Sequence, residues 1–283
     1  MTFNIRLETK EPDPQDNWSA RREAVANFLQ VSGADVIGLQ EARPRQLEYL
    51  VAIMGKFGYS RVGVGRDADG GGEASPIFFK NDRFELEREQ TCWLSSTDAG
   101  LRAVPGSQLA GARCPRVVTC AALRERSGEQ VFVFCAHLDH QGMAKAKVTG
   151  GLPVQEAQAE ILVQTVDAFC GDAAGPRIVV GDFNSWRSAG APPVLLKAGY
   201  VDASSCAGKA NDQPTFVGFK SGSMFRRLVE RAISMHIDWI FIKNGPQISD
   251  YTVNPSQYVS KGGKLRNLSD HLAVCATLHM NES

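Results

Sequence analysis

The chain alternates short apolar runs with amphipathic stretches, and this pattern predicts a layered α/β protein. Over residues 19–32 the apolar side chains recur at helical spacing, and Gly33 supplies a stop signal. A continuous apolar run predicts a buried strand over 35–40. Pro44 is well placed to begin a second helix, which the glycine at position 55 would end.

Further strands and helices follow to the end of the chain. Apolar runs predict strands over residues 59–64, 77–79, 84–89, 117–123, 131–136, 178–182, 214–219, 237–242 and 272–278. Residues 126–129 would join two of these strands as a hairpin, and helices are expected over 154–169 and 193–197. Two packed sheets with helices outside, in a single domain over 1–283, would place the polar strand ends at one edge.

Composition sets broad limits. A chain of 283 residues that is 43% hydrophobic can bury a sizeable core. Lys plus Arg and Asp plus Glu both total 31, so no global field attracts nucleic acid or membrane, and any attraction to phosphate is local. The seven cysteines lack paired spacing and indicate reduced thiols. No apolar run approaches the roughly 20 residues that span a bilayer, so we expect a cytoplasmic, monomeric protein.

Candidate chemistry lies where strands end. Gly181-Asp182-Phe183-Asn184 follows an apolar run, and Ser269-Asp270-His271 precedes another. An isolated Asp-Phe-Asn after a strand is more often a turn. Acids at two strand ends instead favour a metal-assisted hydrolytic site.

Glu41 and Asp270 have the chemistry of ligands for Mg²⁺. Hard divalent cations take oxygen ligands, usually one or two carboxylates, and Mn²⁺ is expected to substitute. Glu41 follows the apolar strand at 35–40, and Asp270 stands at the start of the last one. Asn4 lies at the edge of the first apolar run and belongs with this group.

Hydrolysis of a phosphate ester also requires a base and donors. Charge gathers on the phosphoryl oxygens during attack, so donors must surround them; His137, Asn184 and His271 are suitable. Asp182 is the candidate base for water. Asp238 lies inside an apolar strand, where an unpaired carboxylate is costly, so we expect it to pair with His271.

In order and type, these motifs resemble those of the endonuclease/exonuclease/phosphatase superfamily, the DNase I-like metal-dependent phosphohydrolases. The matching residues run nearly the length of the chain: Asn4, Gln40-Glu41, His137-Leu138, Gly181-Asp182-Phe183-Asn184, Asp238 and Ser269-Asp270-His271. The resemblance implies a four-layer α/β/β/α sandwich of two packed mixed sheets with outer helices. It also implies Mg²⁺-dependent hydrolysis of phosphoric ester bonds, by a phosphodiesterase, nuclease or phosphatase.

Other stretches resemble one bacterial and lower-eukaryotic branch of that superfamily: Gly65-Arg66-Asp67, Trp93-Leu94-Ser95, Pro115-Arg116-Val117, His137-Leu138-Asp139-His140-Gln141 and Pro214-Thr215-Phe216. From these, Arg66, Asp139 and His140 are candidate substrate-loop residues. The chain departs from the branch in the longer link at 142–153 and in opening only three residues before Asn4. Either its first strand is short or the natural start lies upstream.

Two basic clusters have no fixed role from sequence. The cluster of Lys220, Arg226, Arg227 and Arg231 is better explained as a solvated helix face. Lys261, Lys264 and Arg266 precede Ser269-Asp270-His271 and are candidates to border the phosphate site.

Two other functions remain open at this point. A metallo-β-lactamase-like zinc hydrolase would use an H-x-H-x-D-H motif, but Cys135 stands where the first histidine belongs. A catalytically silent binding module on the same fold predicts the loss of a core residue, and none is missing. The substrate, a small molecule or nucleic acid, is not determined, because substrate choice depends on loops. Neutral charge mildly favours a small or RNA-derived ester over duplex DNA.

Overall fold

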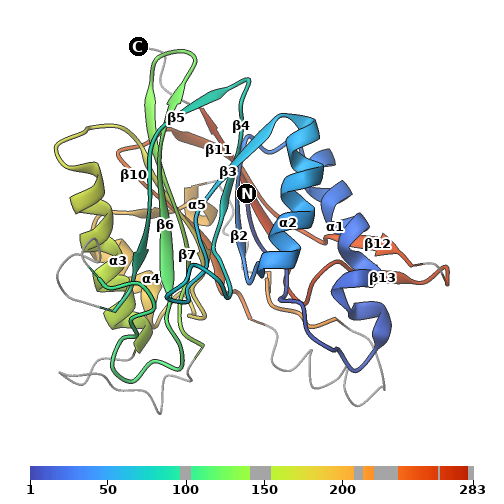
Figure 1. The fold of residues 1–283 in the computed structure, drawn as a ribbon. Helices are drawn as coiled ribbons and strands as arrows, with labels where there is room; N and C mark the ends of the chain where they lie inside the picture. Colours follow the sequence, from blue (N-terminus) through green and yellow to red (C-terminus); the bar gives the residue numbers. More distant parts are fainter. Residues whose placement is uncertain (96–102, 141–153, 207–212, 220–234, 261, 280–283) are drawn as a thin grey trace.

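The computed structural model describes residues 1–95, 103–140, 154–206, 213–219, 235–260 and 262–279, and within these the chain forms two sheets that pack face to face. Helices cover the outer face of each sheet (Figure 1). The first sheet has six strands, in the order β11 (Gln247–Asn254), β14 (Ala273–His279), β1 (Thr2–Asn4), β2 (Val36–Gln40), β4 (Ile77–Lys80) and β3 (Tyr59–Val62).

The second sheet also has six strands. Their order is β5 (Phe84–Trp93), β6 (Val117–Glu125), β7 (Gln130–His137), β8 (Arg177–Asp182), β10 (Asp238–Lys243) and β9 (Val201–Asp202). A separate two-stranded ribbon pairs β12 (Gln257–Val259) with β13 (Leu265–Asn267).

The helices complete the outer layers. Beside the first sheet lie η1 (Pro14–Asp16), α1 (Trp18–Val31), α2 (Pro44–Met54) and η2 (Gly55–Phe57). Beside the second sheet lie α3 (Val154–Cys170) and α4 (Ala191–Lys197), and α5 (Ala203–Cys206) follows β9. The expected α/β/β/α sandwich of two mixed sheets is confirmed.

The strand directions bring distant polar residues to one edge. β1 pairs parallel to β2, and β7 pairs parallel to β8, so each of these four strands ends at the same side of its sheet. β14 runs antiparallel to β1, and β10 runs antiparallel to β8. The beginnings of β14 and β10 therefore lie beside the ends of β1 and β8, which is where the sequence places its acids.

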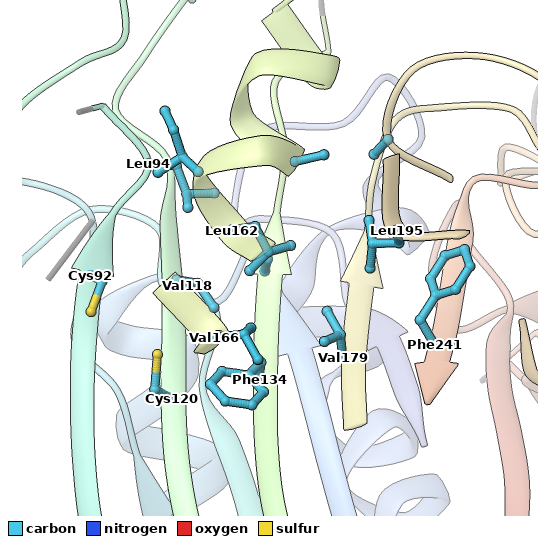
Figure 2. Close-up of a cluster of buried hydrophobic side chains, with 14 of the residues drawn as sticks. Cys92, Leu94, Val118, Cys120, Phe134, Leu162, Val166, Val179, Leu195 and Phe241 are labelled. Atoms are coloured by element: carbon cyan, nitrogen blue, oxygen red, sulfur yellow. The ribbon is translucent and has the colours of Figure 1, made fainter. Parts of the chain in front are cut away.

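Three apolar clusters hold the layers together. One contains inward-facing side chains of both sheets, including Phe79 of the first and Val180 of the second. A second lies between the second sheet and α3, where Leu162 and Val166 cover Phe134 (Figure 2). The third joins the first sheet to α1 and α2. Burial of this apolar surface is the main favourable term for the fold.

The sheets approach closely at Gly38. A Cβ atom there would lie 2.6 Å from Val180 Cγ2 of the facing sheet, too close for any side chain. Glycine is therefore required at this position by packing rather than by a turn.

Most of the predicted helices and strands are present, but the structure differs near residue 214 and contains strands that were not predicted. The predicted strand over 214–219 is wrong: in that segment Phe216 makes only isolated bridges, to Met235 and His271. The hydroxyl of Thr215 accepts hydrogen bonds from the backbone N–H groups of Ile237 and Asp238, and these bonds hold the segment in place as a loop. The edge strand β11 was not predicted, because its exposed positions are largely polar and its buried apolar positions are few.

Two further expectations concern the cysteines and membrane spans. The cysteines whose pairing is described, Cys92, Cys114, Cys120, Cys135, Cys170 and Cys275, are all free thiols. Within the described ranges, no helix is long and apolar enough to cross a membrane.

Candidate active site

Three polar residues form a row across neighbouring strands of the second sheet. His137 at the end of β7 lies opposite Asp182 at the end of β8, and Asp182 lies opposite Asp238 at the start of β10. The glycine of the Gly-Asp-Phe-Asn motif makes this register possible, because a Cβ at Gly181 would lie 1.9 Å from the carbonyl oxygen of Ala136.

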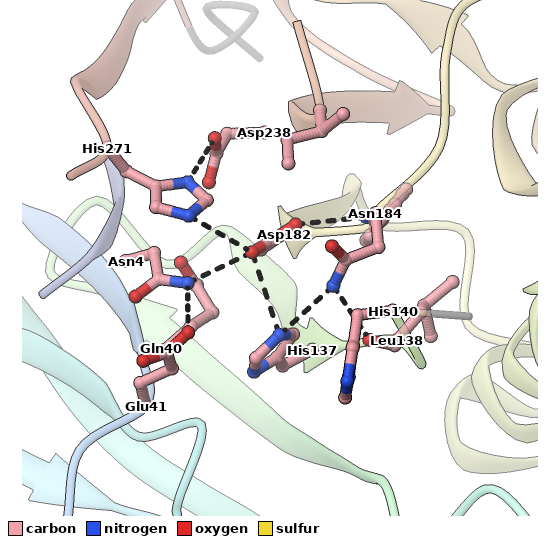
Figure 3. A network of polar contacts seen from close by, with 12 residues as sticks. Asn4, Gln40, Glu41, His137, Leu138, His140, Asp182, Asn184, Asp238 and His271 are labelled. Atoms are coloured by element: carbon pink, nitrogen blue, oxygen red, sulfur yellow. Dashed lines mark hydrogen bonds and ion pairs between the residues drawn. The ribbon is translucent and has the colours of Figure 1, made fainter. Parts of the chain in front are cut away.

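The first sheet supplies a facing set. Asn4 ends β1, Glu41 follows β2, and Asp270 and His271 precede β14. Figure 3 shows Asn4 and His271 pointing toward Asp182, with Glu41 beside Asn4. All of them are buried, and with the row of the second sheet they form one polar network inside the sandwich.

A cavity of about 400 Å³ opens onto this network. It is lined by Arg6, Leu7, Glu41, Arg66, Glu73, Cys114, Arg116, His137, His140, Asp182, Asn184, Phe216, Met235, Ile237, Asp270 and His271. A second cavity, of about 320 Å³ near Met1 and Cys275, lies away from these groups, and none of the predicted site residues lines it. The chemistry therefore belongs to the first cavity.

Both carboxylate oxygens of Asp182 are held. Asn4 Nδ2 donates to Oδ2 at 2.9 Å, and the backbone N–H of Asn184 donates to Oδ1 at 2.9 Å. His137 Nε2 and His271 Nε2 lie 3.6 Å and 3.7 Å from Oδ2. Burial and the nearby charge of Asp238 raise the pKa of Asp182 to about 7.

His271 and Asp238 form the expected pair. His271 Nδ1 lies 2.9 Å from Asp238 Oδ2, and both side chains are buried. Burial alone would lower the pKa of His271, but Asp238 and then Asp182 raise it to about 10. The imidazole is therefore cationic at neutral pH, with both ring nitrogens protonated and Nε2–H directed toward Asp182.

His137 has the opposite character. Burial, reinforced by the positive charge of Arg116, lowers its pKa well below the usual value, so this imidazole is neutral. Asn184 Nδ2 lies 3.2 Å from His137 Nε2 and also donates to the carbonyl of Leu138 at 3.1 Å. Since an amide nitrogen only donates, Nε2 accepts and the proton of His137 lies on Nδ1.

Glu41 and Asp270 bring two carboxylates to the cavity wall. Glu41 accepts from Asn4 Nδ2 at 3.0 Å and from the backbone N–H of Leu7 at 2.8 Å. Burial opposes its ionisation, but the Leu7 N–H and the charge of His271 lower the pKa of Glu41. Burial, together with repulsion from Glu41, raises the pKa of Asp270. A cation between two buried carboxylates would relieve that repulsion.

A second cluster of possible metal ligands is less suited to a cation. Asp182, Asp238 and His271 place ligand atoms within 4.8 Å of one another, close enough for a metal ion. His271 Nδ1 is already bonded to Asp238, however, and a cationic imidazole has no lone pair to offer. Among the described residues Glu41 has no ion-pair partner, and Asp270 has a long contact with Arg6, whose Nη1 lies 3.6 Å from Asp270 Oδ2. These two carboxylates therefore fit a hard ion better.

Backbone strain is concentrated around the cavity. Among the described residues, five other than glycine have positive φ, and the three that line the cavity are Arg6 (58°), Glu41 (62°) and Asn184 (47°). Each follows a strand that ends in a polar motif. Such conformations cost free energy and persist where surrounding contacts hold them, which is common at functional sites.

The candidate substrate-loop residues differ in position. Arg66 lines the cavity but forms a two-contact ion pair with Glu73, with Arg66 Nη2 2.9 Å from Glu73 Oε1. His140 lines the cavity beside His137 (Figure 3). Asp139 is fully buried, where its Oδ2 accepts the backbone N–H of Arg113 at 2.8 Å. The geometry thus favours a supporting role for Asp139.

Of the two basic clusters, the structure describes only Lys264 and Arg266. The cluster beginning at Lys220 and the link at 142–153 lie outside the described residues, as does Lys261. Arg266 contacts Asp13 and Asp16 at 2.9 Å and 3.0 Å, so the expectation that it borders the phosphate site is wrong. These acids near η1 attract Arg266 to the ribbon rather than to the cavity.

Sequence reasoning missed three arginines near the cavity. Arg6 Nη1 lies 3.6 Å from Asp270 Oδ2, and Arg6 also pairs with Glu11 at 2.8 Å. Arg116 was noted only within a motif, and Arg113 carried no signal at all. A buried arginine directly before an apolar strand, as Arg116 is, was the available clue.

Two mixed sheets flanked by helices, with an Asn, Glu, His and Asp network at their common edge, define the class of DNase I-like phosphohydrolases. The chain belongs to the endonuclease/exonuclease/phosphatase family, whose profile matches residues 1–271. Members of this family hydrolyse phosphoester bonds and generally depend on divalent metal ions. Membership makes the metallo-β-lactamase-like alternative wrong.

Solved structures show the same fold. A mannosyl-6-phosphatase from Bacteroides thetaiotaomicron VPI-5482 is 24% identical, with TM-score 0.82, and the match covers 99% of this chain and 98% of that one. An endonuclease/exonuclease/phosphatase from Bacteroides vulgatus is 25% identical, with TM-score 0.77 and coverage of 99% and 97%. The human Nocturnin catalytic domain is 18% identical, with TM-score 0.65 and coverage of 96% and 91%. Among curated proteins, none matches the chain significantly in sequence.

Proposed function

We propose that this protein hydrolyses phosphate esters with the help of Mg²⁺, for which Mn²⁺ can substitute. The observation that carries the proposal is the in-register row of His137, Asp182 and Asp238, of which His137 and Asp182 line one cavity together with Glu41 and Asp270. Proton-accepting, proton-donating and cation-binding groups thereby meet in a volume suited to a small ester.

Asp182 is the proposed general base. Its two oxygens are fixed by Asn4 and by the backbone N–H of Asn184, so the carboxylate is oriented before substrate arrives. A carboxylate held in this way accepts a proton from water at the moment the water attacks phosphorus. Asn184 has a second role, because its amide fixes the tautomer of His137.

His271 and His137 are the proposed phosphate donors. His271, kept cationic by Asp238, donates from Nε2 to an oxygen that gains charge during attack. Neutral His137 donates from Nδ1 on the other side. The pair supplies one charged and one uncharged donor to the same group.

Glu41 and Asp270, with Asn4 nearby, would hold the divalent ion. When bound, such an ion neutralises phosphoryl charge and lowers the pKa of coordinated water. The donors are oxygens, and within the described residues the cavity wall offers no cage of thiolates or several free imidazoles. This donor set fits Mg²⁺ or Mn²⁺ rather than zinc.

Replacing Glu41 by Gln is expected to raise the Mg²⁺ concentration for half-maximal rate by about tenfold to a hundredfold. Changes even to outer partners of a bound metal commonly cost that much, and Glu41→Gln removes one of two ligand charges. Rates measured against Mg²⁺ concentration test this, with calorimetric Mg²⁺ titration as a readout independent of turnover. Glu85→Gln, on the exposed face of β5, is the matched control. An unchanged metal requirement in both Glu41→Gln and Asp270→Asn would contradict the assignment.

A substrate panel tests the function as a whole. Phosphomonoesters, cyclic nucleotides, single strands and plasmid should be offered with Mg²⁺, with Mn²⁺ and with chelator. The mannosyl-6-phosphatase that shares this fold is named for action on a phosphorylated sugar, so sugar phosphates belong in the panel. Failure to cleave any ester would leave the catalytically silent binding module as the better explanation.

A further inference from the structure

One wall of the cavity carries guanidinium groups without a carboxylate partner among the described residues. Arg116 and His140 line the cavity, and the exposed Arg113 contacts His140. Arg113 Nη1 lies 2.8 Å from His140 Nε2, and Arg116 Nη2 lies 3.0 Å from His140 Nδ1. One imidazole is thus bracketed by two arginines.

This arrangement has more donors than acceptors. A guanidinium only donates, and a neutral imidazole has one accepting nitrogen and one N–H. Only one of the two contacts can therefore be a hydrogen bond. In the remaining contact, an N–H group of the arginine faces an N–H group of the imidazole. Burial and the charge of Arg116 lower the pKa of His140, and a protonated His140 would have no accepting nitrogen at all.

Arg116 has a further unmet donor. Its side chain is 4% exposed, and its Nε is buried without a hydrogen-bond partner in the part of the chain that is described. A buried N–H left without an acceptor costs free energy, and such groups are rare in native proteins. This wall of the cavity therefore lacks a negatively charged hydrogen-bond acceptor.

The neighbouring charges do not supply it. Arg66 and Arg6 already have ion-pair partners, in Glu73 and Glu11 respectively. Asp139 is buried nearby, but its described contact is with the backbone N–H of Arg113 rather than a guanidinium. The charges of Arg113 and Arg116 therefore remain available to a ligand.

We propose that Arg113, Arg116 and His140 bind a second oxyanion of the substrate, a phosphate or a carboxylate. The scissile phosphate would lie in the cavity beside Asp182 and His271. This inference rests on the ester hydrolysis proposed above and narrows its substrates to small esters that carry two anionic groups. Arginines bind such oxyanions with short, charge-assisted hydrogen bonds. Phe216, Met235 and Ile237 line the cavity as well and would contact the carbon skeleton.

The first test is binding without turnover. Calorimetric titration of the metal-free protein with inorganic phosphate, in chelator, should show one site. Arg113→Gln and Arg116→Gln should each weaken it by about tenfold, the loss expected for one charge-assisted hydrogen bond. Arg126→Gln is the control, because the side chain of this exposed arginine donates to the carbonyls of Asn81 and Asp82 and does not line the cavity. Acetate in place of phosphate shows whether a carboxylate suffices.

The second test compares substrates with Mg²⁺ present. The ratio of kcat/KM for glucose 1,6-bisphosphate to that for glucose 6-phosphate should fall about tenfold in each arginine variant. The corresponding ratio for 6-phosphogluconate reports on a carboxylate as the second group. Arg113 is exposed, so Arg113→Gln remains informative if Arg116→Gln does not fold.

The outcomes separate this inference from the proposed function. Absence of phosphate binding by the metal-free protein, or unchanged binding and unchanged ratios in both variants, overturns the subsite. Phosphate binding that depends on the arginines, in a protein that cleaves no ester, supports the subsite and defeats only the hydrolase.

Discussion

Replacing Asp182 by Asn is expected to lower kcat by two orders of magnitude or more while substrate binding persists. A positioned general base typically contributes that much, and the amide cannot accept the proton of water. The variant keeps the size of the side chain at a position that is buried between Asn4 and Asn184. Single-turnover kinetics test this. The rate at saturating enzyme reports the chemical step without product release, and the dependence of that rate on enzyme concentration reports substrate binding.

A buried aspartate outside the cavity provides the control for this substitution. Asp202 in β9 belongs to the same sheet, is 3% exposed, and accepts from Arg187 and Ser204. Asp202→Asn should change stability but leave kcat within about threefold, since Asp202 contacts no residue of the polar network. Near-normal kcat in Asp182→Asn would assign the base to another group.

His271 and Asp238 are expected to show strongly non-additive effects on catalysis. Loss of one preorganised donor to a developing oxyanion typically lowers kcat by about 10² to 10³. His271→Ala removes the donor, and Asp238→Ala removes the charge that keeps the imidazole cationic and oriented. The double variant should be little slower than the slower single variant, because both act on one transition-state interaction.

Asp238→Asn refines the test. The amide keeps the shape of the side chain but removes its charge, so it should resemble Asp238→Ala in kcat if charge is what matters. Losses that multiply in the double variant would show that the two residues act independently. Thermal unfolding of each variant separates catalytic loss from loss of the buried pair's contribution to stability.

Sequence motifs do not show which arginines near the cavity are free to bind substrate. Arg66 and Arg116 both stand in stretches that resemble one branch of the family, and nothing in those stretches distinguishes them. In the structure Arg66 is neutralised by Glu73, whereas Arg116 has an unpartnered Nε. Whether an arginine is available to substrate depends on its neighbours in space, and those come from distant segments.

The sequence determined the layers and the chemistry of the strand ends. Apolar periodicity predicted α1, α2, α3 and most central strands, because their buried faces impose it directly on the residue pattern. Asp182 and His271 were proposed as site residues because their motifs stand at the ends of apolar strands, and Asp238 because an unpaired carboxylate inside an apolar strand is costly. The pairing of Asp238 with His271 followed from the same cost, and the structure places their atoms 2.9 Å apart.

Only the tertiary structure decided the features of the site that depend on strand direction and on side-chain packing. The parallel pairs β1–β2 and β7–β8 and the antiparallel pairs β1–β14 and β8–β10 bring Asn4, Glu41, Asp182 and Asp270 together, and no local pattern encodes those directions. The loop near Phe216 was mistaken for a strand because its apolar residues are buried without a strand partner: Phe216 lines the cavity, and Val217 and Phe219 are buried in the core. The surplus of donors around His140 emerges only when Arg113 and Arg116 lie on either side of it, since hydrogen-bond satisfaction is a property of the folded neighbourhood.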